Sequence, residues 1–243
     1  MPTAAVRPPV SPPGSAPVAP ATPCRATAHQ LVVHRLVRRE FRVLTRLATW
    51  AAPDDPARTT ALAAHADLVG RVLLQHHALE RDLIWPTLLR ALPAEDADRA
   101  RGRIADWTAR TARVDRLLRD VGTAARQWSV TGTAAARDSF AMACLVLAGT
   151  LDGQTAEEER ALLPLLAVLP AEQWSAITAA AGCALSAREQ MFVLGLALED
   201  AGPGEQARLL AALTPATRTA WRLNGRRRYR AAVIRLRGEP PAA

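Results

Sequence analysis

The sequence predicts an all-α protein, namely an up-down-up-down four-helix bundle with an appended C-terminal helical region. Hydrophobic residues make up 49% of its 243 residues and aromatic residues only 4%, and alanine and leucine dominate the apolar set. Such a composition favours helices over strands. Apolar positions recur at helical spacing in four long segments, and prolines and glycines separate these segments by mostly short connections. Long helices with such connections are typical of antiparallel bundles.

Residues 1–26 are Pro, Ala, Val and Ser with almost no charge, which predicts a disordered tail. The bundle is expected over residues 27–169. Its first helix is predicted to begin at the capping box Thr27-Ala28-His29-Gln30 and to end before Pro53. The second is predicted to begin after Asp55 at Pro56, to run toward Leu92 and to be kinked by Pro86.

The third helix is predicted to open at Pro93-Ala94-Glu95 and to end near Val121, before a turn-rich linker that reaches Gly132. The fourth is predicted over residues 134–169, with a kink at Pro164. Residues 170–243 are predicted to form shorter helices that pack on the bundle. A capping box at residues 186–189 and a Thr-Pro pair at residues 214–215 mark two of their starts.

Composition and charge limit the classes of function. The formal net charge of +8 comes from arginine, because the chain has no lysine, and a basic surface attracts polyanions. The arginine-rich residues 224–237 have no recognition-helix motif and contain a single aromatic residue, Tyr229, so a solvated helix face is favoured over nucleic-acid binding. Cys24, Cys144 and Cys183 show no CxxC spacing, which fits a reducing cytoplasm, and the latter two are expected to be small buried residues.

We expect a soluble cytoplasmic protein without a membrane partner. Prolines interrupt the N-terminus and leave no apolar signal-peptide region. The longest apolar run, residues 140–151, is shorter than the roughly 20 residues that span a bilayer. Nothing indicates an enzyme, since no Gly-rich phosphate loop, GxSxG motif or Ser/His/Asp order is present.

Two histidines in the second predicted helix are the first indication of a site. His76 lies four residues before Glu80, and positions i and i+4 share one helix face, so both side chains can bind the same ion. His77 points about 100° away and is at most a supporting residue. His34 lies on or beside the apolar stripe of the first helix.

The end of the second predicted helix is repeated at the end of the fourth. Both copies contain a glutamate, a proline six residues later and a Leu-Pro-Ala-Glu string: Glu80, Pro86 and residues 92–95, then Glu158, Pro164 and residues 169–172. The offset is 158 − 80 = 78, which places Gln154 opposite His76.

The first and third predicted helices repeat at nearly the same offset. The pattern HxxVxRxxR from His34 corresponds to TxxVxRxxR from Thr111, and 111 − 34 = 77. The chain is therefore expected to form a pseudo-two-fold bundle. One half offers His34, His76 and Glu80, and the other offers Thr111, Gln154 and Glu158.

Four strings together resemble those of a known family. They are His34-Arg35-Leu36-Val37-Arg38-Arg39-Glu40, His76-His77-x-x-Glu80-x-x-x-x-Trp85-Pro86, Ala112-Arg113-Val114-Asp115, and Glu158-Glu159-x-x-x-Leu163-Pro164-Leu165. Over residues 28–169 the chain resembles the hemerythrin-like, or HHE cation-binding, family of four-helix bundles. The resemblance implies a non-haem di-iron centre with histidines from all four helices and two bridging carboxylates. It also implies a role in binding oxygen, in sensing oxygen or redox state, or in handling iron.

The chain departs from the family pattern in one half of that centre. His34, His76, Glu80 and Glu158 match ligand positions of the family. Thr111 stands where the third helix is expected to carry a histidine. In the fourth helix the pattern His-x-x-His-Glu-Glu is replaced by residues 154–159, QTAEEE, so Gln154 replaces the first histidine. Imidazole is a far better iron ligand than a hydroxyl or an amide oxygen, so the second metal position should be weak or empty.

Two hypotheses remain open. The first is a mononuclear or weak site for non-haem iron or another divalent cation, with the metal ion or O2 as ligand. The second is a metal-free helical scaffold or regulator that binds an unknown protein partner through the bundle and the arginine-rich C-terminus. In the second case His34 and His76 would be buried histidines whose hydrogen bonds to Glu80, Glu158, Gln154 and Thr111 satisfy them without an ion.

Overall fold

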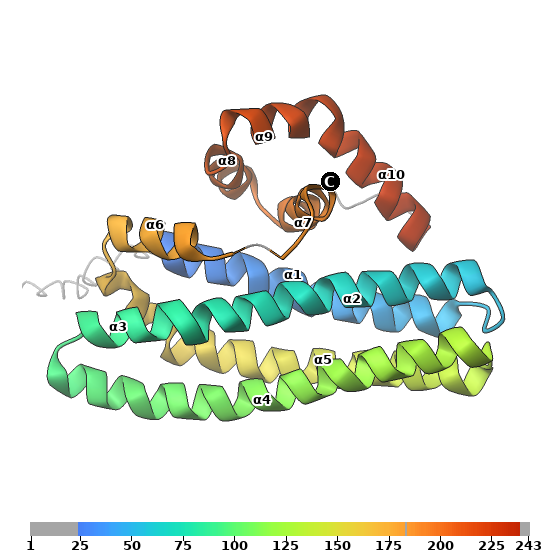
Figure 1. The fold of residues 1–243 in the computed structure, drawn as a ribbon, viewed down its shortest axis with the longest axis horizontal. Helices are drawn as coiled ribbons and strands as arrows, with labels where there is room; N and C mark the ends of the chain where they lie inside the picture. The colour runs from blue at the N-terminus through green and yellow to red at the C-terminus, as the bar shows by residue number, and fades with distance from the viewer. Residues whose placement is uncertain (1–23, 183, 239–243) are drawn as a thin grey trace, which may run out of the picture.

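The computed structural model describes residues 24–182 and 184–238 of the chain. An antiparallel bundle of four long helical rods forms one layer of the molecule (Figure 1), which confirms the predicted all-α class, and no strand occurs among the described residues. The elements of the bundle are α1 (Arg25–Trp50), α2 (Pro56–Leu79), the π-helix η1 (Glu80–Ile84), α3 (Trp85–Ala91), α4 (Ala94–Thr131), α5 (Ala134–Ala161) and the 3₁₀-helix η2 (Leu163–Val168).

The first two helices differ in how well their starts were predicted. α1 begins at Arg25, because the sulfur of Cys24 caps it by accepting from the Thr27 backbone N–H. The prediction of a cap at Thr27 is therefore wrong by three residues, and residues 24–26 are ordered as the cap and first turn. The rest of the predicted tail lies outside the described residues. α2 begins as predicted at Pro56, after the Asp55 cap.

The third bundle helix is longer than predicted. Instead of a turn-rich linker after Val121, α4 continues to Thr131 and ends at Gly132, whose φ of 60° is favourable only for glycine. Ala125 and Trp128 on the added turns are buried, and the Trp128 indole N–H donates to the Pro53 carbonyl at 2.9 Å. Burial of these side chains outweighs the weak helix propensity of the segment.

Both bundle prolines disturb their helices, although not as simple kinks. In η1 the Trp85 N–H donates to the carbonyl of Glu80, five residues earlier, so the disturbance precedes Pro86. The fourth rod stops being α-helical at Ala161 and continues as η2, which contains Pro164. A proline lacks an N–H and its ring crowds the carbonyl four residues earlier, which explains both interruptions.

Polar residues interrupt the apolar interior of the bundle at one level. One apolar cluster includes Leu73 of α2 and Leu151 of α5, and a second, toward α3, includes Ile84 and Leu162. The candidate ligands of α2, η1 and α5 fall between these clusters in the sequence. Large apolar side chains therefore close the interior on both sides of the candidate site.

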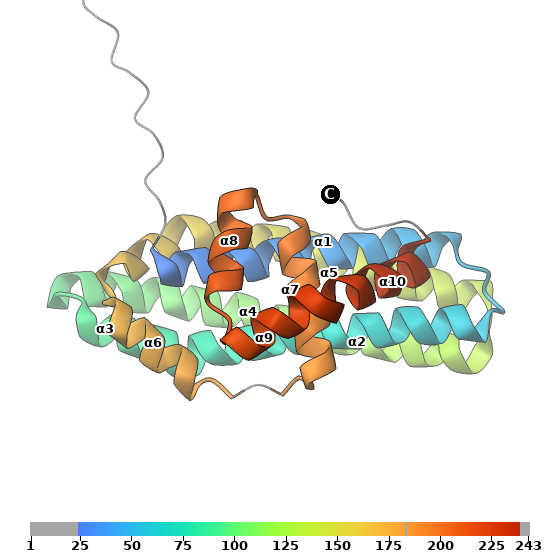
Figure 2. The same ribbon diagram turned by 90° about the horizontal axis from the view of Figure 1, so that it is seen from above.

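The remaining helices form a second layer on one side of the bundle. They are α6 (Ala171–Ala180), α7 (Ala187–Glu199), α8 (Pro203–Ala211), α9 (Pro215–Ala220), the π-helix η3 (Trp221–Gly225) and α10 (Arg226–Arg237). This extension lies over α1 and α2, away from α4 and α5 (Figures 1 and 2). The predicted capping box at Ser186 and Glu189 is present, and α9 starts at Pro215 after the Thr214 cap.

A buried network of charged groups joins the extension to the bundle. Glu40 of α1 is fully buried and contacts His65 Nε2 at 2.8 Å, Arg39 Nε at 2.7 Å and Arg237 Nη2 at 2.9 Å. Arg237 also contacts Glu199 Oε1 at 2.6 Å. The arginine-rich C-terminus is therefore not wholly a solvated face, because the side chain of Arg237 is 7% exposed.

One helix of the bundle bears on the prediction that no segment spans a membrane. Among the described residues, α5 is the one helix whose length and composition would allow it to cross a membrane, but core helices of bundles meet the same criterion. α5 packs against α1 and α4, so its length and composition are weak evidence for a span.

Cys144 is fully buried, as expected, and burial raises the pKa of its thiol to about 12. Cys183 lies outside the described residues.

Candidate metal centre

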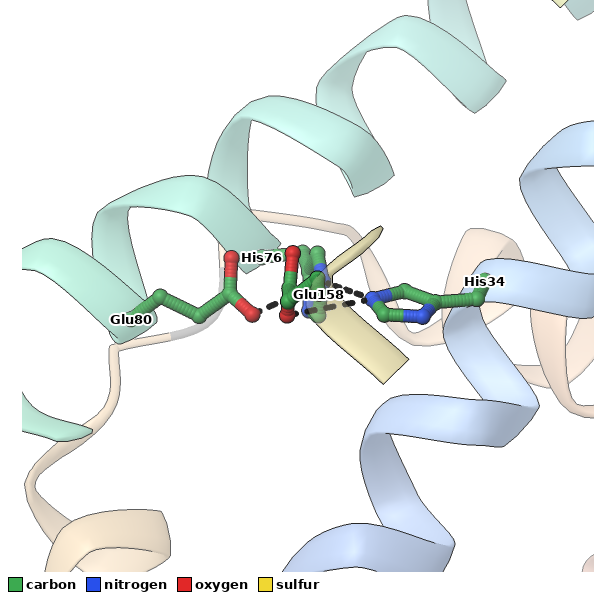
Figure 3. Close-up of side chains that lie close together, drawn as sticks. All are labelled: His34, His76, Glu80 and Glu158. Atoms are coloured by element: carbon green, nitrogen blue, oxygen red, sulfur yellow. Dashed lines mark hydrogen bonds and ion pairs between the residues drawn. The ribbon is translucent and has the colours of Figure 1, made fainter. Parts of the chain in front are cut away.

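The structure brings the four predicted ligands together in the interior of the bundle. They come from α1, α2, η1 and α5, and they point toward one another (Figure 3). One ligand atom from each residue can be chosen so that all four atoms lie within 4.8 Å of one another. The four, hereafter the cluster, are His34, His76, Glu80 and Glu158, and none is more than 5% exposed.

Short contacts between nitrogen and oxygen atoms define the cluster. His34 Nε2 lies 3.1 Å from His76 Nε2 and 3.4 Å from Glu158 Oε1. His76 Nε2 lies 3.3 Å from Glu80 Oε1. His76 and Glu80 meet because they are one helical turn apart, and the Glu80 N–H still bonds to the His76 carbonyl at the start of η1.

Three more side chains orient the cluster from outside. The Gln30 amide donates to Glu80 Oε1 at 2.7 Å, and the Trp107 indole N–H donates to Glu158 Oε2 at 3.0 Å. The Nδ1 atom of His34 lies 3.0 Å from Glu159 Oε1. A carboxylate on the second ring nitrogen of a histidine fixes which nitrogen faces the site, an arrangement that most metal-binding histidines share.

Sequence reasoning did not find these supporting residues, although one signal was available. Gln30 precedes His34 by four residues and therefore lies on the same face of α1. Trp107 follows Gln30 by 107 − 30 = 77 residues, the offset already found between the first and third helices. Applying the offset of 77 to Gln30 would therefore have identified Trp107 as its counterpart in the third helix.

The internal duplication is visible as matched hydrogen bonds. The contact of His34 with His76 is repeated by Gln154 Nε2 donating to Thr111 Oγ1 at 3.1 Å. The bond from Gln30 to Glu80 is repeated by the bond from Trp107 to Glu158. In a third match, the hydrogen bond between Arg38 and Thr155 at 3.0 Å corresponds to the contact between Asp115 and His77 at 3.2 Å.

The second half of the duplicated centre offers no nitrogen base. Thr111 and Gln154 are buried, and the Gln154 amide donates to the Thr111 hydroxyl oxygen. His77 is buried rather than exposed, but it contacts Asp115 and not the cluster carboxylates. Donor atoms suited to one cation are present, and those for a second are missing.

The pKa shifts divide the cluster into two pairs, one shifted toward its charged form and the other toward its neutral form. Burial lowers the pKa of His34, but its contacts with Glu158 and Glu159 outweigh burial and raise it overall. Burial raises the pKa of Glu158, and His34 reverses this and lowers it. Burial and the charge of His34 hold the pKa of His76 well below its usual value. Burial and the Glu158 carboxylate hold that of Glu80 well above its usual value.

The donor atoms fit a single cation. Glu80 Oε2 and Glu158 Oε1 are buried without a hydrogen-bond donor among the described residues, apart from the 3.4 Å contact of Glu158 Oε1 with His34 Nε2. An unpaired buried acceptor costs about 1–3 kcal/mol, which a bound cation would offset. Two imidazoles and two carboxylates suit Fe(II) and other divalent first-row metals, and two histidines with one carboxylate form the facial set of mononuclear iron sites.

Comparison with known proteins identifies the family. The model of the family described as "Hemerythrin HHE cation binding domain" matches residues 26–166, which is more than half of the chain. The chain belongs to this hemerythrin family. Neither a search of curated proteins nor a search of solved structures gave a match.

Membership of the hemerythrin family connects the bundle with cation binding. The match ends at residue 166, within η2, so it covers the bundle and leaves out the extension. All four cluster residues fall inside the match. The cluster is therefore the candidate cation site of this hemerythrin domain.

Proposed function

We propose that this hemerythrin-domain protein binds one non-haem iron ion, or another divalent cation, through His34, His76, Glu80 and Glu158. The observation that carries the proposal is the burial of four converging ligand atoms, two nitrogens and two oxygens, within 4.8 Å of one another. Family membership supports a cation as the ligand. The proposed role is in oxygen, redox or iron handling, as a cytoplasmic binding or sensing protein rather than an enzyme.

Bound iron would supply a redox-active centre that can react with oxygen. The residues of the chain hold and orient its ligands. Glu159 keeps the proton of His34 on Nδ1, so that Nε2 faces the site. Gln30 and Trp107 each fix one oxygen of a cluster carboxylate. The apolar clusters on either side exclude water and strengthen the attraction between the carboxylates and a cation.

Metal stoichiometry tests the proposal. After anaerobic loading with Fe(II) and removal of free metal, mass spectrometry should find about one iron per wild-type chain and far less in His76→Ala. A His65→Ala variant is the control, because His65 is a buried histidine of the same helix that contacts Glu40 instead of the cluster. Circular dichroism verifies that each variant is folded. Iron-free wild-type protein after loading would contradict the proposal.

The metal-free regulator remains the alternative because the cluster residues also contact one another directly. His34 and His76 are within hydrogen-bond distance, and Gln30 and Trp107 donate to the two carboxylates. A ligand that binds only the folded state must raise apparent stability. Melting temperatures that do not change with a chelator or with added Fe(II) would favour the regulator.

A further inference from the structure

The last helical segment of the chain carries charge of one sign only. α9, η3 and α10 follow one another without a break from residue 215 to residue 237. This segment, hereafter the C-terminal rod, contains eight arginines and no aspartate or glutamate. The family match ends at residue 166, so the rod lies outside the matched domain. Cation binding by the bundle therefore does not account for the charge of the rod.

Two of the eight arginines hold the fold together, and six do not. Arg218 donates to three backbone carbonyls at the end of α8, and Arg237 pairs with two buried glutamates. Arg228 lies 3.0 Å from the side-chain amide of Asn224, which is neutral. Six arginines of the rod are exposed and form no ion pair with a described residue: Arg222, Arg226, Arg227, Arg228, Arg230 and Arg235. Like charges without counter-charges repel one another, and an anionic partner would offset this repulsion.

The outer side of the rod is opposite the side that packs on the molecule. The inner side consists of buried residues at every fourth position, namely Trp221, Gly225, Tyr229 and Val233. Positions two residues later, such as Leu223 and Arg227, lie on the opposite side of a helix. The view from the side of the extension shows the rod in front of α1 and α2 (Figure 2), so its outer side faces away from the bundle.

Two apolar side chains lie among the exposed arginines. Leu223 and Ile234 are 81% and 41% exposed. Leu223 precedes Arg227 by four residues and Ile234 follows Arg230 by four, so each apolar side chain is next to an arginine on the helix surface. At a lipid surface such side chains enter the boundary between headgroups and acyl chains, while the arginines stay at the level of the headgroups.

The same surface fits a nucleic acid less well. Phosphate contacts supply most of the affinity for a nucleic acid, and they leave Leu223 and Ile234 in water. Aromatic side chains that stack on bases have to be exposed, whereas Trp221 and Tyr229, the aromatic residues of the rod, are buried. Charge and exposed apolar side chains together therefore favour a lipid surface.

We propose that the outer side of the C-terminal rod binds the surface of a membrane that contains anionic phospholipids. Each arginine close to such a surface strengthens binding about fivefold. Binding of this kind needs no membrane-spanning helix, so the lack of a long apolar run in the sequence does not bear on it. The proposal goes beyond the proposed function and does not rest on a bound metal.

Sedimentation with vesicles tests the proposal on the full chain. In about 0.1 M salt, wild-type protein should bind phosphatidylcholine vesicles that contain about 30% phosphatidylserine, and not vesicles of phosphatidylcholine alone. The double variant Arg227→Ala and Arg230→Ala should bind about 25-fold more weakly, because two contacts with the anionic surface are lost.

The matched control removes the same charge from another surface. Arg113 and Arg119 are exposed arginines of α4, which the extension does not cover. The double variant Arg113→Ala and Arg119→Ala should bind the anionic vesicles as the wild type does, and circular dichroism verifies that both double variants are folded. Equal losses in the two double variants, or equal binding of the wild type to both kinds of vesicle, would overturn the proposal.

Leu223→Ser distinguishes a membrane from a nucleic acid. The variant should bind anionic vesicles at least about fivefold more weakly, because an apolar side chain no longer leaves water. Its binding to a DNA duplex of about 20 base pairs, which depends on phosphate contacts, should not change. Vesicle binding that Leu223→Ser leaves unchanged, or wild-type binding that is tighter to the duplex than to the vesicles, would overturn the membrane in favour of a nucleic acid.

Measuring iron in the same samples separates this proposal from the proposed function. Iron in protein that does not bind anionic vesicles overturns the membrane contact and leaves the metal site. Vesicle binding that depends on Arg227 and Arg230, in protein that takes up no iron, supports the membrane contact and contradicts the metal site.

Discussion

Glu159 shows how a single residue outside the cluster can control it. Its carboxylate lies 3.0 Å from His34 Nδ1 and 3.2 Å from Arg38 Nη2, so it links a candidate ligand to a charge nearer the surface. An acceptor at this position keeps His34 in the tautomer that presents Nε2 to the site. Neighbouring Glu157 points elsewhere and pairs with Arg160.

Glu159→Gln is expected to weaken metal affinity by about 10- to 100-fold, because the amide cannot stabilise the His34 N–H as a carboxylate does. Competition of the protein with a chromophoric chelator for Fe(II) or Zn(II) measures the change. Glu157→Gln is the matched control and should leave the affinity unchanged. The same loss in both variants would mean that overall charge, and not the contact with His34, governs affinity.

Restoring nitrogen ligands at two of the substituted positions is expected to create a second metal site. In the double variant Thr111→His and Gln154→His, two imidazoles would join Glu80 and Glu158 on the opposite side of the pseudo-two-fold axis. Mass spectrometry after iron loading should then find about two ions per chain. Histidines at the exposed positions Thr108 and Ser139 of the same helices form the control pair and should leave one ion. One ion in the double variant would contradict the duplication as an account of the site.

The residues of the cluster were predictable from the sequence because helical spacing and the internal repeat both constrain them. His76 and Glu80 share a face by spacing alone, and Glu158 follows from the offset of 78. The partner of His34 Nδ1 was not predictable in this way. The Glu159 side chain has to reach from α5 to α1, and this depends on how closely the two helices pack.

At the scale of elements, η1 places Glu80 at the junction between two apolar clusters. A π-helical turn has one more residue per hydrogen-bonded ring than an α-helical turn, and such turns are frequent at functional sites. Pro86 predicted a disturbance, and it is present. Its position, which begins at Glu80, depends on which backbone groups lose partners and could not be read from the proline alone.

Helix ends were predictable where local chemistry determines them. Asp55 with Pro56, Ser186 with Glu189, and Thr214 with Pro215 start helices where their side chains predict. The end of α4 was mispredicted because burial of Trp128 decides it. The burial of Trp128 depends on residues far away in the sequence, since its indole donates a hydrogen bond to the carbonyl of Pro53, 75 residues earlier.

The buried contact of Glu40 in α1 with Arg237 in α10 is expected to make the free energy of unfolding fall at acid pH. Burial raises the pKa of Glu40, but His65, Arg39 and Arg237 reverse this and lower it from its usual 4.5 to about 2. A lowered folded pKa stabilises the protein fully above the unfolded value, and this stabilisation is lost as pH falls toward about 2.

Urea unfolding of wild type and Glu40→Gln at pH 6 and pH 3 measures this effect. Glutamine cannot ionise, so about 2 kcal/mol of the difference in unfolding free energy between the two proteins should disappear between these pH values. A difference that stays constant would show that the folded structure does not lower the pKa of Glu40.

At the scale of the whole molecule, the extension breaks the pseudo-symmetry of the bundle. It covers α1 and α2, which carry both histidines of the cluster (Figure 2). The described residues leave the duplicated face on α5 uncovered, and the side chains of Met142, Leu145 and Val146 are 57%, 49% and 43% exposed. The half of the bundle that the extension covers, α1 and α2, is therefore also the half that retains the histidine ligands. The sequence predicted that the extension packs on the bundle, but not on which half, because the contacts that decide this join residues far apart, such as Arg237 and Glu40.

Arg237→Ala is expected to loosen the extension while leaving the bundle intact. Removing this guanidinium leaves the buried carboxylates of Glu40 and Glu199 without one of their cations, a change that costs about 3 kcal/mol at a buried pair. Hydrogen exchange of amides in α7 and α10 should therefore accelerate roughly hundredfold, while exchange in α4 and α5 stays the same, because the ion pairs of Arg237 join α10 to α1 and α7. Arg230→Ala, at an exposed position of α10, should change neither. Acceleration of the same size in all helices would mean that the extension and the bundle unfold as one cooperative unit, so that the metal centre and its covering layer gain or lose stability together.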